Sequence, residues 1–428
     1  MTVLIAGGGI AGLALGLTCH QIGVPFKVFE SVTEIKPQGV GINLQPTAVR
    51  ELFDLGLEDE LPKIGVKTRD YGMYSKIGRQ IWVEPRGTWA GYKWPQYSVD
   101  RGKLHMILYE TLLERAGLGC VHTGWSVERF ENTVEGVALH LLGANGDCKM
   151  EYGAVAVGAD GIHSVVRKQM WPDQGEPNWA GHVLWRGTTR AKPFKSGASM
   201  VMIGSGEKRF VSYPISEVDS ETGLATINWI AELKFVPGEA GERGNWNRIA
   251  DLDDFLPQLS TIEVDWIDIP GLINGAKTVY EYPMVDRDPI CTWTDGNVTL
   301  MGDAAHAAYP VGSNGAGSAI IDARELGAAF LACGVNADAL HAYESKMLSS
   351  ASKVVLMNRT VGPDSILGTV EERCGGVFDS IEDIIPKADL VAHAAKYKAA
   401  AGFGIEETNA APPTITVNSK LFPPLKQE

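Results

Sequence analysis

Three glycines near the N-terminus have the spacing of a nucleotide-binding turn. Gly7, Gly9 and Gly12 follow the short apolar run 3–6 and precede residues 10–21, whose apolar spacing is that of a helix. In such a unit the first glycine permits a tight turn and the second lets a pyrophosphate approach the backbone. The third glycine allows the helix to pack closely on the strand. Unpaired N–H groups at the helix start would then bind the phosphates.

An acidic residue ends the next predicted strand. Glu30 closes the run 26–30, where its carboxylate can accept hydrogen bonds from ribose hydroxyls. An acid at this place favours an unphosphorylated ribose, as in FAD or NAD. A glycine-rich turn without a ligand is the alternative, but the strand–turn–helix context favours dinucleotide binding.

Two downstream segments carry further polar residues at turns, GADGIHSVVR at 158–167 and MGDAAHAAYPVGSNGAG at 301–317. Asp303 follows a buried strand and precedes small residues, so its carboxylate suits a cofactor hydroxyl; capping of the next turn is the alternative. For Asp160 the capping alternative is stronger, because Asp-Gly before a helix is a common cap. A histidine beside a cofactor often transfers protons, so His306 is a candidate general base.

These three motifs, in this order, resemble those of FAD-dependent aromatic monooxygenases of the p-hydroxybenzoate hydroxylase type. The resemblance covers about residues 1–365. Further stretches, GVGINLQPTAV, EPRG, WPQYSVDRGKLHMIL and YPMVDRDPI, look like the 5-methylphenazine-1-carboxylate 1-monooxygenase branch of the family. The resemblance implies that NAD(P)H reduces FAD, that O2 forms a C4a-hydroperoxyflavin, and that one oxygen atom passes to an aromatic or heteroaromatic ring, carboxylated rings included.

The resemblance also implies roles for individual residues, and it favours a structural role for His306 over that of a general base. Asp160 would contact FAD, Asp303 would bind the ribityl chain, Arg101 would reach the cofactor, and Pro310 would line the reactive face of the flavin. The helix that opens after Asn314 would stabilise negative charge on the reduced ring. The expected FAD contacts are Gly7, Gly9, Ile10, Ala11, Gly12, Glu30, Gly41, Arg101, Val127, Asp160, Asp303, Pro310, Gly312, Asn314, Gly315 and Ala316.

The segment between about 181 and 285 differs in texture from the rest of the chain. It is rich in β-branched and aromatic residues separated by Gly, Pro and Ser, which predicts an inserted, mostly antiparallel sheet. Aromatic walls suit a flat substrate, although core packing is the commoner fate of strand aromatics. The candidate substrate contacts are Trp185, Arg186, Tyr213, Trp229 and Tyr309, with Tyr282 beside them, and the candidate catalytic residues are Pro310, Tyr213 and Arg186.

The predicted fold is α/β: a Rossmann-like FAD-binding domain of the glutathione-reductase type, an inserted β-sheet substrate domain and C-terminal helices. The expected boundaries are 1–70, 98–180 and 285–365 for the FAD domain, 71–97 and 181–284 for the substrate domain, and 366–428 for a C-terminal segment. A second GxGxxG motif is absent from the sequence, which fits transient binding of NAD(P)H. Residues 39–42, with two glycines, would leave the flavin room to move.

Composition limits the classes of partner. The chain has 428 residues and a net charge of −14 without a Lys/Arg cluster, so we expect no nucleic-acid partner. Six scattered cysteines indicate neither disulfides nor a metal site. No apolar run predicts a membrane span and the N-terminus lacks a signal-peptide pattern, so we expect a cytoplasmic monomer or homodimer.

Two alternatives to simple hydroxylation remain open at this point. The first is another reaction of the same flavin chemistry, either decarboxylative hydroxylation or Baeyer–Villiger oxidation, which would use the same motifs. The second is a flavin-fold protein that binds aromatic ligands without catalysis.

Overall fold

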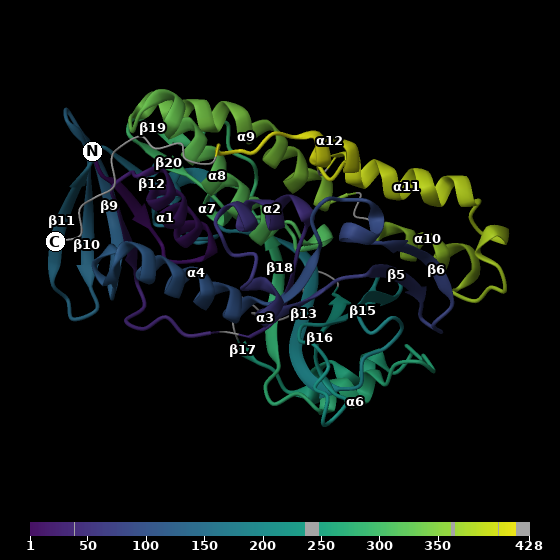
Figure 1. The fold of residues 1–428 in the computed structure, drawn as a ribbon. Helices are drawn as coiled ribbons and strands as arrows, with labels where there is room; N and C mark the ends of the chain where they lie inside the picture. The colour runs from purple at the N-terminus through teal and green to yellow at the C-terminus, as the bar shows by residue number, and fades with distance from the viewer. Residues whose placement is uncertain (38, 236–247, 361–363, 401, 417–428) are drawn as a thin grey trace.

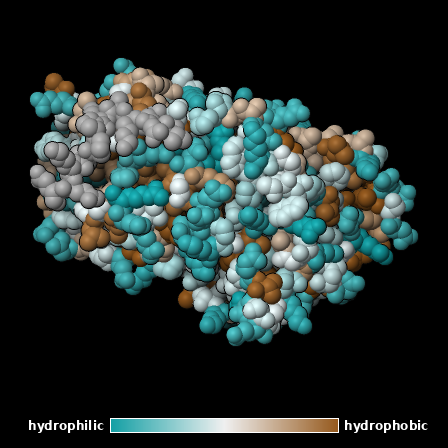
Figure 2. Space-filling model, in the orientation of Figure 1, coloured by the Kyte–Doolittle hydropathy of each residue, from teal (hydrophilic) through white to brown (hydrophobic). Residues whose placement is uncertain are grey.

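Two large β-sheets organise the chain, with helices packed along them (Figure 1). The computed structural model describes all residues except 38, 236–247, 361–363, 401 and 417–428. No helix within these described ranges is long and apolar enough to cross a bilayer. The visible surface is mainly hydrophilic, with hydrophobic residues scattered over it (Figure 2).

The first sheet is the parallel sheet expected around the glycine turn. Its six strands run in the order β19-β20-β12-β1-β2-β8, and every pairing is parallel except β19 with β20. All four residues of β1 are buried, as in a parallel sheet covered on both faces. Its strands are β1 (Val3–Ala6), β2 (Phe26–Glu30), β8 (Val121–Thr123), β12 (Val155–Gly158), β19 (Thr294–Asp295) and β20 (Val298–Leu300). The predicted Rossmann-like domain is confirmed.

The second large sheet has eight strands drawn from two separate stretches of chain. Their order is β17-β18-β13-β16-β15-β14-β5-β6, and they pair antiparallel apart from the parallel pair β14 and β5. The strands are β5 (Asp70–Ser75), β6 (Gln80–Pro85), β13 (Asn178–Ala191), β14 (Ser199–Gly204), β15 (Lys208–Pro214), β16 (Ala225–Lys234), β17 (Arg248–Ile249) and β18 (Tyr280–Asp286). The predicted, mostly antiparallel sheet is therefore confirmed.

Two small sheets of three strands complete the β-structure. An antiparallel set joins β9 (Trp125–Thr133), β10 (Gly136–Gly143) and β11 (Cys148–Gly153). A second set joins β3 (Gly41–Leu44), β7 (Tyr97–Asp100) and β4 (Gly65–Lys67). The second set brings the glycine-bearing segment at Gly41 next to the start of the helix that begins at Arg101.

Helices cover the parallel sheet and then continue past it. The chain re-enters helix after β20, and α9, α12 and α11 follow one side of the molecule in Figure 1. The longer helices are α1 (Ile10–Ile22), α2 (Pro46–Asp54), α4 (Arg101–Ala116), α8 (Gly315–Cys333), α9 (Ala337–Asn358), α10 (Ser365–Cys374) and α11 (Lys387–Ala400). The short ones are α3 (Leu61–Ile64), α5 (Val165–Met170), α6 (Ile269–Asn274), α7 (Asp303–His306) and α12 (Ile405–Ala410). The predicted C-terminal helices are confirmed.

The two faces of the eight-stranded sheet have different surroundings. Side chains alternate between faces along a strand. One face packs with α6 into an apolar core that includes Trp185, Phe210 and Trp229. The opposite face, which carries Leu184, Tyr213 and Ile230, looks toward the segments that follow β20.

Candidate active site

The glycine turn after β1 has room where a pyrophosphate would approach it. Gly7 has a φ of +104°, and a Cβ there would collide with the carbonyl of Ala159. A Cβ on Gly12 would collide with the carbonyl oxygen of Gly7, so helix and turn are in close contact. Gly9 differs, because no protein atom lies within 4 Å of the position its Cβ would take. Close packing at the first and third glycines with space at the second fits a dinucleotide.

A cavity of about 350 Å³ lies beside this turn. Glu30 and Val127 line it, together with Asp160 from the second motif. One oxygen of Glu30 accepts the N–H of Gly8 at 2.7 Å, and the other accepts two hydrogen bonds from the next residues at 3.0 Å. A carboxylate has about four acceptor positions. Within the described residues, one acceptor position of Glu30 therefore stays open.

The carboxylate of Asp160 is already hydrogen-bonded within the protein. It accepts hydrogen bonds from the Ser164 hydroxyl at 2.5 Å and the N–H of Val165 at 2.8 Å, and so caps the start of α5. Burial raises the pKa of Asp160, and these hydrogen bonds oppose the rise. The capping role is what the structure displays, and a contact with FAD stays a prediction.

Asp303 has a different environment from Asp160. It is exposed as the first residue of α7, directly after Gly302, whose φ is 59°. No hydrogen bond reaches its carboxylate from the described part of the chain. An exposed carboxylate at a helix start is available to a hydroxyl-bearing ligand.

His306 is tied into the fold. Its Nε2 lies 2.6 Å from Oδ2 of Asp322, a fully buried carboxylate that also accepts the N–H of Gly302 at 2.8 Å. Burial lowers the pKa of His306, but the charge of Asp322 outweighs burial and the net direction is upward. The ring also packs against Trp293, with centroids 5.4 Å apart. These contacts support the structural role.

The segment between α7 and α8, residues 310–314, is held by side chains from distant parts of the chain. The amide of Asn358 donates to the carbonyl oxygens of Tyr309 and Val311 at 3.0 and 3.2 Å. The amide of Gln45 donates to Gly312 O at 3.3 Å. The segment then enters α8 at Gly315, followed by Ala316, so the free N–H groups of a 19-residue helix start beside it.

Both backbone polar groups of Gly41 are hydrogen-bonded to side chains of the eight-stranded sheet. Its N–H donates to Oδ1 of Asn228 at 2.6 Å, and its carbonyl oxygen accepts from Arg186 at 2.7 Å. A Cβ at Gly41 would lie 2.6 Å from Cγ of Asn228 and 2.7 Å from Cε2 of Tyr213. Only glycine fits this close approach of β3 to the sheet.

A second cavity lies between the residue 310–314 segment and the eight-stranded sheet. Pro310 and Gly312 form part of its wall, and Tyr213 lies on the facing sheet. The sheet side is mainly apolar, and consists of Leu184, Met200, Met202, Val211, Tyr213 and Ile230. Burial raises the pKa of Tyr213 to about 12, so its phenol stays protonated at neutral pH. The C-terminal segment adds Ala394, Lys398 and Phe403 to the wall.

Two of the candidate substrate contacts lie on the wrong face of the sheet. Trp185 and Trp229 are fully buried in the core beside α6, where Trp185 stacks on Phe255 with centroids 4.7 Å apart. Their neighbours Leu184 and Ile230 face the cavity instead, because side chains alternate along a strand. The prediction that these two indoles line the substrate site is therefore wrong.

The other candidates lie at or near the cavity. Tyr213 lines it; Arg186 lies behind it, holds Gly41 and packs over the Tyr282 ring at 6.0 Å. Tyr309 precedes the lining segment but is not part of the wall. Arg101 is exposed at the first turn of α4, and its backbone N–H donates to Val40 O at 2.9 Å.

Sequence reasoning missed the side chains that hold the backbone around the site. Nε2 of His105 lies 2.6 Å from the carbonyl oxygen of Gly8, and Asn228, Gln45 and Asn358 hold the segments described above. Each contact joins residues far apart in the chain. Local spacing carries no signal for such partners.

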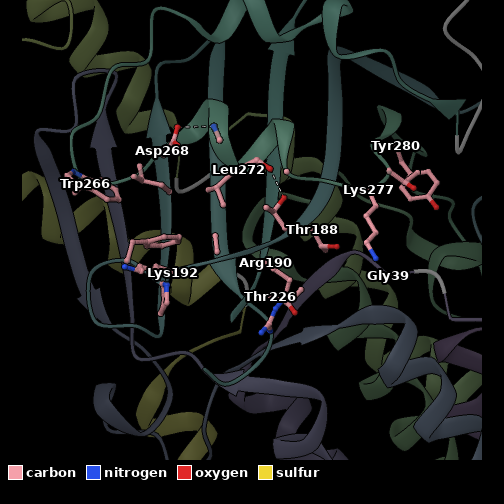
Figure 3. A pocket seen from close by; sticks show the side chains of 18 of the residues that line it. Gly39, Thr188, Arg190, Lys192, Thr226, Trp266, Asp268, Leu272, Lys277 and Tyr280 are labelled. Carbon is pink, nitrogen blue, oxygen red and sulfur yellow. Dashed lines mark hydrogen bonds between the residues drawn. The ribbon is translucent and has the colours of Figure 1, made fainter. Parts of the chain in front are cut away.

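A larger cavity, about 960 Å³, is distinct from both of these. It lies at the far end of β13, between Trp266 and Tyr280, with the cations Arg190, Lys192 and Lys277 around it (Figure 3). Its rim approaches the glycine-bearing segment at Gly39, yet none of the predicted site residues lines it. Gly7, Gly9 and Asp160 line the first of the two smaller cavities, and Pro310 and Gly312 line the second.

Comparisons with known proteins show the family. Residues 1–357 match the family described as "FAD binding domain". The phenazine 1,6-dicarboxylic acid hydroxylase of Lysobacter antibioticus is 39% identical over 83% of this chain and 89% of its own length.

The chain belongs to this family of FAD-dependent monooxygenases. The 3-amino-4-hydroxybenzoate 2-monooxygenase of Streptomyces platensis is 30% identical over 89% of this chain and 94% of that protein. A solved salicylate hydroxylase superposes with a TM-score of 0.71 at 20% identity, covering 96% of this chain and 97% of the other, and shares the fold. This monooxygenase is therefore an enzyme, and FAD is its cofactor.

Proposed function

We propose that this monooxygenase uses NAD(P)H and O2 to hydroxylate a carboxylated, fused-ring heteroaromatic compound of the phenazine type. The observation that carries the proposal is the second cavity, whose wall includes both Pro310–Ser313 and an apolar sheet face around Tyr213. A flat ring in it would lie between the flavin side and an apolar surface. The 39% identical relative is named for a phenazine dicarboxylic acid, which supports the ring type.

Within this proposal the nucleotide half of FAD lies in the cavity beside the glycine turn. Gly7, Gly9 and Gly12 would bring the backbone to the pyrophosphate, and Ile10 and Ala11 at the start of α1 would offer N–H groups to it. Glu30 would accept a ribose hydroxyl. Val127 and Asp160 line the same cavity.

The flavin half would lie along the residue 310–314 segment. Bound FAD supplies the redox chemistry, taking a hydride from the nicotinamide and activating oxygen. Asp303 would accept from the ribityl chain, with Arg101 nearby. The α8 start at Asn314, Gly315 and Ala316 would stabilise negative charge on the reduced ring.

On the substrate side, Tyr213 would hydrogen-bond a polar group of the ring. Its phenol stays protonated, and Arg186 behind it fixes both the phenol and Gly41. The apolar methionine face of β14 would exclude water from the reacting ring. We further propose a cytoplasmic enzyme that acts as a monomer or homodimer.

Substrate-stimulated NAD(P)H oxidation by the purified holoenzyme tests the proposal. We expect phenazine-1-carboxylic acid to accelerate oxidation and to yield a product heavier by one oxygen atom. Loss of carbon dioxide would identify decarboxylative hydroxylation instead. Tyr213→Phe should reduce the rate, whereas Tyr152→Phe, an exposed residue on β11, is the matched control. No acceleration by any ring acid across phenazines, quinolines and hydroxybenzoates would contradict the proposal.

A further inference from the structure

Three charged side chains meet where the C-terminal segment closes the second cavity. Glu84, on the edge strand β6, lies 2.9 Å from a guanidinium nitrogen of Arg86 and 2.8 Å from Nζ of Lys398 on α11. Arg86 also lies over the Tyr71 ring, 4.9 Å from its centroid. Arg86, Lys398 and Tyr71 all line the cavity.

This cluster carries an excess positive charge. Burial raises the pKa of Glu84, but the charges of Arg86 and Lys398 outweigh it and lower the pKa overall. An ionised Glu84 offsets only one of its two cationic neighbours. The cavity's other acids, Glu232 and Asp364, share one cation, Arg209, so the positive charge is local to the Arg86 and Lys398 corner.

The same corner contains polar atoms that lack partners within the described residues. Nε of Arg86 is buried without a hydrogen bond, and so is Oε1 of Gln96. Gln96 is only 2% exposed and lines the same cavity. Buried polar groups are nearly always paired. The unpaired guanidinium N–H needs an acceptor, which a ligand carboxylate would supply, whereas the Gln96 oxygen needs a donor.

We propose that Arg86 and Lys398 bind the carboxylate of the ring substrate, an inference that rests on the proposed function. Arginine suits this task because its planar guanidinium offers several N–H donors to a carboxylate. Arg86 is the main anchor, and Lys398 adds charge from the C-terminal segment. Both are positioning and specificity residues, since neither lies at the flavin side of the cavity wall.

The sheet register sets the length of the substrate. Tyr71 on β5 is opposite Met200 on β14, and the pairing of Val201 with Ser212 places Tyr213 on β15 beside Met200. Tyr213 and Tyr71 are thus two strand spacings apart, roughly 10 Å. An acid of two or three fused rings can span from Tyr213 to Arg86, which lies over the Tyr71 ring. A single benzoate ring is too short to do so.

Ligand titration of the oxidised holoenzyme tests the anchor without turnover. The flavin absorbance change would report the Kd of phenazine-1-carboxylate and of its uncharged carboxamide. We expect Arg86→Gln to weaken acid binding about 10- to 100-fold, the size of a charge-assisted hydrogen bond. The amide should change by less than about threefold by the same scale. Arg79→Gln, an exposed turn residue, is the control.

Further variants keep the test decisive. Arg86→Lys should recover much of the acid affinity, and Lys398→Gln should cause a smaller loss specific to the acid. If Arg86→Gln does not fold, Lys398→Gln supplies the acid-against-amide comparison alone. Equal weakening of acid and amide, or wild-type affinity for benzoate equal to that for the phenazine acid, would overturn the anchor while leaving the hydroxylase activity intact. If no ring compound binds the flavin-loaded wild type, the proposed function fails first and the anchor falls with it.

Discussion

The two aspartates of the downstream motifs should respond differently to removal. The Asp303 carboxylate is exposed and accepts no hydrogen bond from the described residues. Asp303→Ala should therefore cost the apoprotein only the helix-start effect of about 0.3–1 kcal/mol. With FAD bound, the variant would lose a charge-assisted hydrogen bond of about 1.5–3 kcal/mol, a Kd increase of roughly 10- to 150-fold.

Asp160→Ala is the matched comparison. The Asp160 carboxylate accepts the Ser164 hydroxyl and the N–H groups of Val165 and Val166, at 2.5, 2.8 and 3.3 Å. Its loss leaves the first N–H groups of α5 without this acceptor, although Ser164 still caps the N–H of Arg167, and costs about 1–2 kcal/mol of folding stability. This loss should be visible in the apoprotein, before any cofactor is added.

Two measurements on FAD-stripped protein separate the effects. Titration with FAD, followed by quenching of its fluorescence, gives the Kd, and urea denaturation gives the stability of the apoprotein. We expect a large Kd change with near-normal stability for Asp303→Ala and reduced stability for Asp160→Ala. Wild-type FAD affinity in Asp303→Ala would refute the ribityl assignment. Apo Asp303→Ala less stable than apo Asp160→Ala would refute the distinction between them.

Three further outcomes follow from individual contacts. Gly41→Ala should slow substrate-stimulated NAD(P)H oxidation about tenfold or more, because its Cβ would lie 2.6 Å from Asn228 and such overpacking costs about 1–3 kcal/mol; an unchanged rate would show that the segment relaxes freely. Trp229→Ala should lower folding stability by about 3–5 kcal/mol in denaturant melts, while Trp229→Phe leaves ligand Kd unchanged, since the indole faces the core. The raised pKa of His306 means that its stabilisation is complete below pH 6.5 and declines as pH rises through the folded-state value. The stability difference between wild type and His306→Gln should shrink across that range, and a growing difference would reverse the assigned sign.

Local motifs predicted the parts of the molecule in which sequence neighbours act together. The turn at Gly7 lies between strand and helix as expected, and Asp303 begins a helix after a buried strand. In both cases the geometry depends on a few consecutive residues. Composition likewise indicated the inserted sheet, because β-branched and aromatic runs favour strands wherever they occur.

The sequence could not show which face of the eight-stranded sheet packs on the core and which faces the cavity. Alternation requires Trp185 and Leu184 to point in opposite directions, but both faces of this sheet are covered by protein. Hydrophobicity therefore does not distinguish the core side from the cavity side, and the prediction wrongly placed the larger residue, Trp185, at the substrate site. Partners such as Asn228 and Asn358 escaped notice because they contact backbone atoms 187 and 49 residues away.

The C-terminal segment has a consequence for how such enzymes diversify. It is held against β6 and the residues after it by Lys398 on Glu84, by the Tyr92 hydroxyl on Phe403 O, and by Asn409 on Gly91 O at 2.8 Å. The C-terminal partner of each contact lies outside residues 1–357, the part that matches the family. If the proposed substrate site is right, mutation or exchange of this tail would alter which ligands it accepts while the family domain is kept unchanged. Libraries aimed at new substrates would vary residues 387–410 first.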